Sequence, residues 1–178
     1  MASADGNTIY VVGKTISDFD RPGYPPSIAC CHWDAFIAKL DGSGSIQWAH
    51  NLPAVPATGA QTFAEQAFAV TTDAAGAAAF LTGITASVMP GETGKGANDI
   101  FVARFAADGA RTWVRQFGGV PPTQDSTIND AGHGIAIDKN GDIFVTGEVM
   151  ASFGTPNPDT LRTDWFVMKL RAADGTAY

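Results

Sequence analysis

The chain repeats itself at a fixed offset, and this constrains the possible folds more than any other feature. Three segments read DAFIAKL, DIFVARF and DWFVMKL, and they begin at Asp34, Asp99 and Asp164. The offset between successive copies is constant (99 − 34 = 164 − 99 = 65) and is called the repeat offset below. An aromatic residue follows each segment at the same distance; these residues are Trp48, Trp113 and Tyr178. The repeated unit therefore occurs about 2.7 times in the chain.

Each repeated run alternates with the period of two residues that is typical of a β-strand. In 99–105, Ile100 and Val102 lie on one face, and Phe101, Ala103 and Phe105 lie on the other. Turn sequences such as Asn-Gly at 140–141 and Asp-Gly at 108–109 separate the runs, and their glycines accept the positive φ of tight hairpins. No segment shows a sustained helical period. We therefore predict four strands per unit, exemplified by 134–138, 142–147, 164–170 and, in the preceding copy, 111–117.

Four short antiparallel strands per repeat are the unit of a β-propeller blade. The predicted fold is all-β, a partial or oligomer-completed propeller of about 2.7 repeats forming one segment over 1–178. We expect a partial first blade at 1–50 that holds the second to fourth strands, a second blade at 51–117, and a third at 118–178 that is truncated in its last strand. Propellers close with about 4 to 8 blades. The chain is then expected to be part of a longer propeller or to complete a ring with other copies.

The sequences GIAIDKNGDIFVTG at 134–147 and DAFIAKLDGSGSIQW at 34–48 resemble the SBBP bacterial β-propeller repeat family. The links at 117–119 and 130–134 are similar to those between blades of that family. The resemblance implies a secreted or surface-exposed bacterial propeller, extracellular or on the cell surface, with a binding or scaffold role and no catalytic residue set. The chain departs from the family pattern at Ala77–Ala79 and in a Cys-Cys-His insert, about which the resemblance implies nothing.

Charge and hydropathy exclude some partners. The chain has 11 Lys and Arg against 18 Asp and Glu, a formal net charge of −7 with no basic cluster. Binding to nucleic-acid phosphates needs several cations on one face, so no nucleic-acid partner is expected. No stretch is long and apolar enough for a membrane span, and the first residues lack the pattern of a signal peptide.

Long connections are expected to gather at one end of the strands, because the strands alternate in direction. They are 14–33, 84–98 and 148–163 within the blades, and 51–65 and 118–130 between them. Loops on a rigid scaffold often carry binding residues. The candidate ligand-binding residues on them are Tyr24, His32, Trp33, Glu92, Asn98, Asp130 and Arg162. Tyr24 and Trp33 could stack on sugar rings or on a peptide, or could close their own proline-rich loop.

The insert Cys30-Cys31-His32 is the densest chemistry in the chain. Adjacent Cα atoms lie about 3.8 Å apart, below the usual disulfide range, so an ordinary bridge between the two thiols is disfavoured. Two thiols and an imidazole could bind zinc or copper, but adjacent ligands rarely converge on one ion and no fourth ligand is evident. We expect free thiols in a packed loop, with a metal site or an intermolecular or strained disulfide as alternatives. No cofactor is predicted.

Acidic residues recur at the strand entries. Glu65 and Asp130 match each other, and so do the three aspartates at 34, 99 and 164. They could form a cation site or a catalytic pair, but a carboxylate that accepts backbone N–H bonds at each corner explains their repetition better. Asp138–Asp142 resembles the start of a calcium loop, and a hairpin is favoured there instead. His133 matches Phe68, which favours a packed, hydrogen-bonded imidazole over a catalytic base.

The leading functional hypothesis is a non-enzymatic propeller module that presents its long loops to a protein or carbohydrate partner. One alternative is a glycan-active hydrolase that uses loop carboxylates and a histidine. Another is a structural assembly unit that pairs its open blade edges with other copies or with further blades. Catalysis predicts two acids, or an acid and a histidine, within hydrogen-bond reach in a deep pocket. Assembly predicts an apolar interface at each end of the chain.

Overall fold

The computed structural model describes residues 7–17, 19–20, 32–52, 63–119, 129–150, 153 and 162–178, with only the backbone at 32 and 63. These residues form ten strands and no helix, and the descriptions below concern them alone. The strands are β1 (Thr8–Thr15), β2 (His32–Asp41), β3 (Ile46–Leu52), β4 (Phe63–Thr72), β5 (Ala78–Thr85), β6 (Asp99–Ala106), β7 (Arg111–Phe117), β8 (Ala131–Ile137), β9 (Asp142–Met150) and β10 (Thr163–Arg171).

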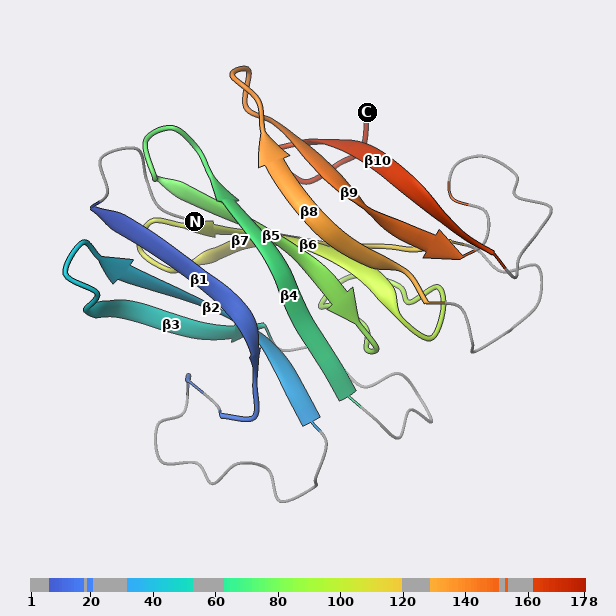
Figure 1. The fold of residues 1–178 in the computed structure, drawn as a ribbon, viewed down its shortest axis with the longest axis horizontal. Helices are drawn as coiled ribbons and strands as arrows, with labels where there is room; N and C mark the ends of the chain where they lie inside the picture. Colours follow the sequence, from blue (N-terminus) through green and yellow to red (C-terminus); the bar gives the residue numbers. More distant parts are fainter. Residues whose placement is uncertain are drawn as a thin grey trace.

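The strands form three antiparallel groups in chain order (Figure 1). The first group is β1–β2–β3, the second is β4–β5–β6–β7, and the third is β8–β9–β10. The strands expected at 111–117, 142–147 and 164–170 are present, the last two extended by a few residues. The all-β prediction is confirmed, and the sheets do not close into a ring within the described residues.

The repeat extends to the joints between groups. The first two residues of β2 pair in parallel with the first two residues of β4, and Trp33 lies opposite Ala64. A second parallel bridge joins Asn98 to Asn129, and each of these follows its counterpart in the first pair by the repeat offset. Each group is therefore attached to the next in the same way at the same end.

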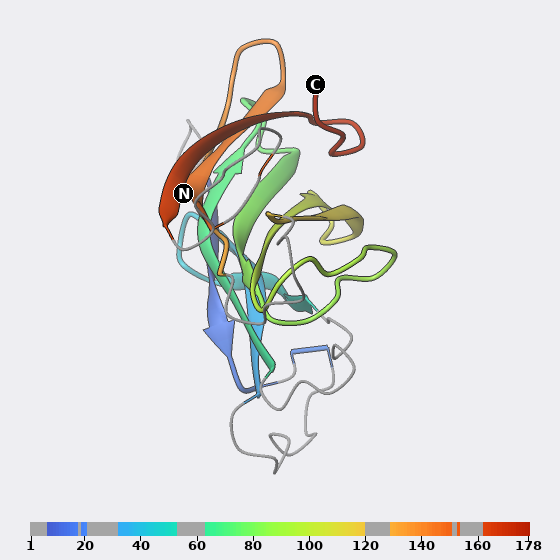
Figure 2. The ribbon, with the colours of Figure 1, turned by 90° about the vertical axis from the view of Figure 1, so that its right-hand side faces the viewer.

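The core has two layers, one on each face of the β4–β7 sheet, because β6 alternates as its sequence predicts. Phe101, Ala103 and Phe105 pack against the first group, whereas Ile100 and Val102 pack against the third. Figure 1 shows β1, β4 and β8 side by side, with the remaining strands of each group spreading away from them. Figure 2 shows the same arrangement turned by 90°, with β10 along the outer edge of the ribbon.

A tryptophan anchors each group to the next. Trp48 on β3 donates its indole N–H to the carbonyl of Ala107 at 3.1 Å, in the β6–β7 turn. Trp113 on β7 donates to the carbonyl of Ala172 at 3.0 Å, in the turn after β10. The two donors are separated by the repeat offset and so are the two acceptors, which makes the periodic aromatic a repeated contact between groups.

Short turns and long connections lie at opposite ends of the strands, as the alternation predicts. Gly109 and Gly141 adopt φ of 91° and 85° in two of the turns, which only glycine tolerates easily. Asp138 accepts the backbone N–H groups of Asn140 and Asp142 at 2.8 and 2.9 Å, so 138–142 forms the hairpin turn expected there. In the described ranges, no helix is long and apolar enough to cross a membrane.

Candidate functional site

Two of the repeated acids hold loops at the long-connection end. Asp99 is buried, and its Oδ2 accepts the backbone N–H of Lys95 at 2.7 Å and the side-chain amide of Gln116 at 2.6 Å. Asp130 is buried as well, and it accepts the N–H groups of Gly119 at 2.6 Å and Met150 at 2.7 Å. These are the backbone bonds expected for a structural role at a strand entry.

Burial changes the protonation of these acids. Desolvation is the main cause that raises the pKa of Asp130 to about 6. The charge of Asp99 also raises this pKa, whereas the backbone hydrogen bonds from Met150 and Gly119 lower it. Desolvation also raises the pKa of Asp99 and of Glu65. Gly118 lies between the first two acids: a Cβ there would sit 2.4 Å from Oδ1 of Asp99 and 3.0 Å from Oδ2 of Asp130. The two carboxyl groups are therefore close neighbours in a dry environment.

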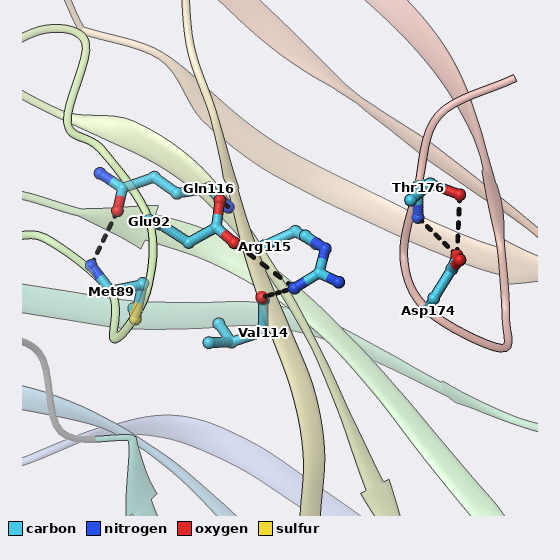
Figure 3. A network of polar contacts seen from close by, with 7 residues as sticks. All are labelled: Met89, Glu92, Val114, Arg115, Gln116, Asp174 and Thr176. Atoms are coloured by element: carbon cyan, nitrogen blue, oxygen red, sulfur yellow. Dashed lines mark hydrogen bonds and ion pairs between the residues drawn. The ribbon is translucent and has the colours of Figure 1, made fainter.

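A side-chain amide on the last strand of each of the first two groups holds the long loop of that group. Gln116 accepts the N–H of Met89 at 2.8 Å (Figure 3). It also donates to the carbonyl of Ser87 at 3.0 Å. Asn51 makes the matching bonds in the first group, accepting from Phe19 at 2.9 Å and donating to Ser17 at 2.9 Å. Each amide also donates to an aspartate near the start of its neighbouring strand, Asp99 of β6 or Asp34 of β2.

An acid from the same loop completes each clamp. Glu92 pairs with Arg115 at 3.4 Å and accepts the backbone N–H of Gln116 at 3.3 Å (Figure 3). Asp20 pairs with His50 at 2.6 Å and accepts the backbone N–H of Asn51 at 3.2 Å. Arg115 follows His50 by the repeat offset, so the histidine–aspartate pair is one copy of a repeated structural contact.

This histidine–aspartate pair lines a groove between the first and second groups. The groove has a volume of about 200 Å³ and is open to solvent; its lining residues are Asp20, His50, Asn51, Phe105, Gly109 and Arg111. Among the described residues, no acidic side chain pairs with Arg111, which is exposed. The guanidinium, the imidazole and an aromatic floor can accommodate an anionic group. Because Gly109 and Arg111 flank a short turn of the second group, the groove lies only partly on the long-loop end favoured by the sequence.

The predicted ligand-binding residues are dispersed. Trp33 is partly exposed, with the ammonium of Lys14 4.9 Å from its ring centroid. Asn98 donates to the side-chain carbonyl of Asn129 and accepts the N–H of Asp130 through its backbone, so 98 and 130 belong to one joint. Arg162 is exposed one residue before β10. Glu92 belongs to the loop clamp described above.

The remaining candidates lie outside the described residues. Tyr24, Cys30 and Cys31 are among them, and only the backbone of His32 is described, as the first residue of β2. Where the structure is described, no group of three or more His, Cys, Asp or Glu could hold a metal ion.

Register shifts on β4 and β8 leave two rings partly exposed to solvent. The strand register shifts between Ala67 and Ala69 and between Gly132 and Gly134. Phe68 and His133, equivalent residues of successive copies, stand at these bulges with ring centroids 5.3 Å apart. His133 also lies 3.2 Å from Glu148 and is half-exposed. The imidazole is thus packed on a ring, as expected, and lies within ion-pair distance of a carboxylate, but it is not buried.

Sequence reasoning missed the loop clamp, although a signal for it exists. After the glycine of the second strand in each unit, the chain reads Thr15-x-Ser17-x-Phe19 in one copy and Thr85-x-Ser87-x-Met89 in the next. In both copies the threonine hydroxyl accepts the N–H of the serine, at 2.9 and 3.1 Å. The two threonines are separated by more than the repeat offset (85 − 15 = 70), so a search at that offset does not reveal the motif.

The chain is an all-β repeat protein. Its three groups of strands are similar, the same joints connect them, and the same clamp occurs in two of them. Residues 112–148, which run from β7 into β9, match the family model described as SBBP, beta-propeller repeat. The chain therefore carries a repeat of the SBBP family, as the sequence resemblance suggested. No curated protein matches the chain.

Proposed function

We propose that this chain is a non-enzymatic β-propeller module whose three groups of strands are successive blades that act as a rigid scaffold for a protein or carbohydrate partner. The blades correspond to β1–β3, β4–β7 and β8–β10. The observation that carries the proposal is the repeated clamp. It holds Ser17, Phe19 and Asp20 after β1 in the same way as Ser87, Met89 and Glu92 after β5. Rigid loops on a rigid scaffold lose little conformational entropy when they bind.

The acids that a hydrolase would use are occupied by the scaffold. Asp130 accepts backbone N–H groups with both carboxylate oxygens, and Asp99 accepts a backbone N–H and an amide N–H with Oδ2. Among the described residues, Oδ1 of Asp99 is buried without a hydrogen-bond partner. The pair of His50 and Asp20 has the hydrogen-bond distance of a catalytic dyad, but the second blade makes the same contact with Arg115 and Glu92. An arginine–glutamate pair does not serve as a general base, so the repetition favours a structural role for both pairs.

The groove beside Arg111 is the place where we propose that the scaffold contacts its partner. Its exposed guanidinium favours a carboxylate, sulfate or phosphate group on a glycan or an acidic peptide, whereas the imidazole of His50 is already paired with Asp20. Asn51 adds an amide at the margin, although its own atoms are engaged with the loop. The chain has a formal net charge of −7, so an anionic partner would be attracted locally by Arg111 and not by the molecule as a whole.

The proposal is tested with a glycan array that includes uronate and sialylated sugars, alongside an array of acidic peptides. We expect the full chain to bind members of one array and Arg111→Ser to weaken that binding at least about tenfold. Lys139→Ser removes one exposed cation from the β8–β9 turn and should leave binding unchanged. Blank arrays, or equal binding by Arg111→Ser and the unmodified chain, would contradict the proposal.

A further inference from the structure

The first and second blades bury the same face of their central strands against the next blade. In β2 this face carries Ala35 and Ile37, and in β6 it carries Ile100 and Val102. All four residues are 0% exposed. The contact between one blade and the next therefore occurs twice within the chain, with the same two positions of the central strand buried each time.

The third blade presents this face to solvent. Trp165 and Val167 on β10 occupy the matching positions, one repeat offset after Ile100 and Val102. They are 82% and 58% exposed, and Tyr178 beside them is 64% exposed. β10 is also an edge strand of its sheet and lies at the margin of the described ribbon in Figures 1 and 2. An apolar face of this kind usually marks an interaction surface.

The polar anchors of the repeated contact are also present on the third blade. Lys39 and Trp48 of the first blade both donate to the carbonyl of Ala107 in the second, at 3.0 and 3.1 Å. Lys169 and Tyr178 stand at the two matching positions of the third blade. There the ammonium lies 4.3 Å from the phenol ring centroid, and both groups contact Asp142. A partner carbonyl would therefore compete with Asp142 for these two donors.

The first blade exposes the complementary face. In the second blade the face toward its predecessor carries Leu81 on β5, which is fully buried, and the side chain of Arg111 lines the groove at its margin. Val11 is the counterpart of Leu81 in the first blade, because each pairs with an equivalent residue of the next strand. Ile46 is the counterpart of Arg111, which it precedes by the repeat offset. Val11 is 42% exposed and Ile46 is 67% exposed.

We propose that the exposed face of the third blade, defined by Trp165, Val167 and Tyr178, binds the exposed face of the first blade of a second copy of this chain. The contact repeats the geometry between blades within the chain, with the carbonyl of Gly42 in the place of Ala107. It is heterologous, because two different faces meet, and two such contacts can close a pair of chains into a ring. The inference rests on the proposed division into blades.

Sedimentation velocity of the full chain tests the association. We expect the mass to rise from one chain of 18.5 kDa to two chains as the concentration increases through the micromolar range. Trp165→Asp combined with Val167→Asp should weaken association at least about 30-fold, since exposed apolar anchors at the centre of an interface dominate binding. The side chains point to solvent, so circular dichroism and urea unfolding should show an intact fold.

A complementation experiment separates the head-to-tail contact from other modes. Val11→Asp combined with Ile46→Asp blocks the other face, and this variant alone should also stay monomeric. When the two double variants are mixed, each supplies one intact face, and we expect a heterodimer. Phe68→Ser, which alters an exposed aromatic on β4 away from both faces, is the matched control and should associate like the unmodified chain.

The outcomes are decisive in each direction. A chain that is monomeric at every concentration overturns the proposal and makes a further blade of a longer chain the occupant of this face. Mixed variants that remain monomeric overturn the head-to-tail contact even if the unmodified chain associates. Ligand binding at Arg111 is measured separately on the arrays, so the proposed function and this inference can fail independently.

Discussion

At the scale of single residues, Asp130 gives the molecule an unusual dependence on pH. Its pKa of about 6 exceeds the ordinary value of 3.8, so between these pH values the folded chain holds a proton that the unfolded chain has released. The contribution of Asp130 to the free energy of unfolding is therefore largest below pH 4 and falls as the pH rises to about 6. For one proton the loss is at most about 3 kcal/mol. Asp99 and Glu65, whose pKa values burial also raises, act with the same sign.

Urea unfolding at pH 4.5 and pH 7 measures this effect, with Asp130→Asn as the test variant. The variant cannot titrate at this position, so we expect a smaller difference between the two pH values than in the unmodified chain. It should also be less stable overall, because one oxygen replaces two acceptors of backbone N–H groups. Asp108→Asn changes an exposed turn aspartate and serves as the control. An unchanged pH dependence in Asp130→Asn would refute the assignment.

Gly83 on β5 and Gly147 on β9 occupy equivalent positions, opposite the bulges of β4 and β8. A Cβ at either position would lie 1.9 Å from a backbone oxygen, that of Gln66 or Ala131. Backbone must move to relieve such a contact, so Gly83→Ala should lower the free energy of unfolding by about 1–3 kcal/mol. Gly94→Ala is the matched control, since its Cβ would meet nothing closer than 3.5 Å. Equal stability of the two variants in urea would show that the bulge adapts without strain.

At the scale of strands and loops, Gln116 connects β7, the last strand of the second group, to the long loop between β5 and β6. Gln116→Ala removes the acceptor of the Met89 N–H and one of the two side-chain donors to the carbonyl of Ser87, the other being the hydroxyl of Thr85. We expect a loss of about 2 kcal/mol in the free energy of unfolding and faster amide exchange at Met89. Gln47→Ala, which removes an exposed glutamine bonded to Asp41, should change neither quantity by as much. Unaltered exchange at Met89 would mean that the loop holds itself.

The strands were predictable from the sequence because their period of two residues is a local property. The alternation in 99–105 assigns each residue of β6 to one of the two core layers, and the structure places them accordingly. The clamp was not predictable in the same way. It joins Gln116 to Met89, 27 positions apart, and the matching pair in the first blade uses a different amide and a different loop residue. Glu92 was thus chosen as a ligand residue, although it pairs with Arg115.

At the scale of the whole molecule, each contact between successive groups of strands is apolar in the middle with a few polar anchors at its edge. The hydrophobic layers contain Ile37 and Phe101 on one side of the second blade, and Val102 and Phe166 on the other. The tryptophan bonds to Ala107 and Ala172 mark the edges. Since the terminal faces repeat this composition, association between copies is expected to depend on apolar burial more than on ion pairs.

This expectation leads to a prediction about salt. Each copy carries a formal net charge of −7, so long-range repulsion opposes association at low ionic strength and is screened as salt is added. Raising NaCl from about 50 mM to about 500 mM shortens the screening length several-fold and should leave the dimer equally tight or tighten it. Sedimentation velocity at both concentrations measures the change, with Trp165→Asp as the reference for lost apolar contact. Dissociation at high salt would instead indicate an interface held by ion pairs, because only attractive charge contacts are weakened by screening.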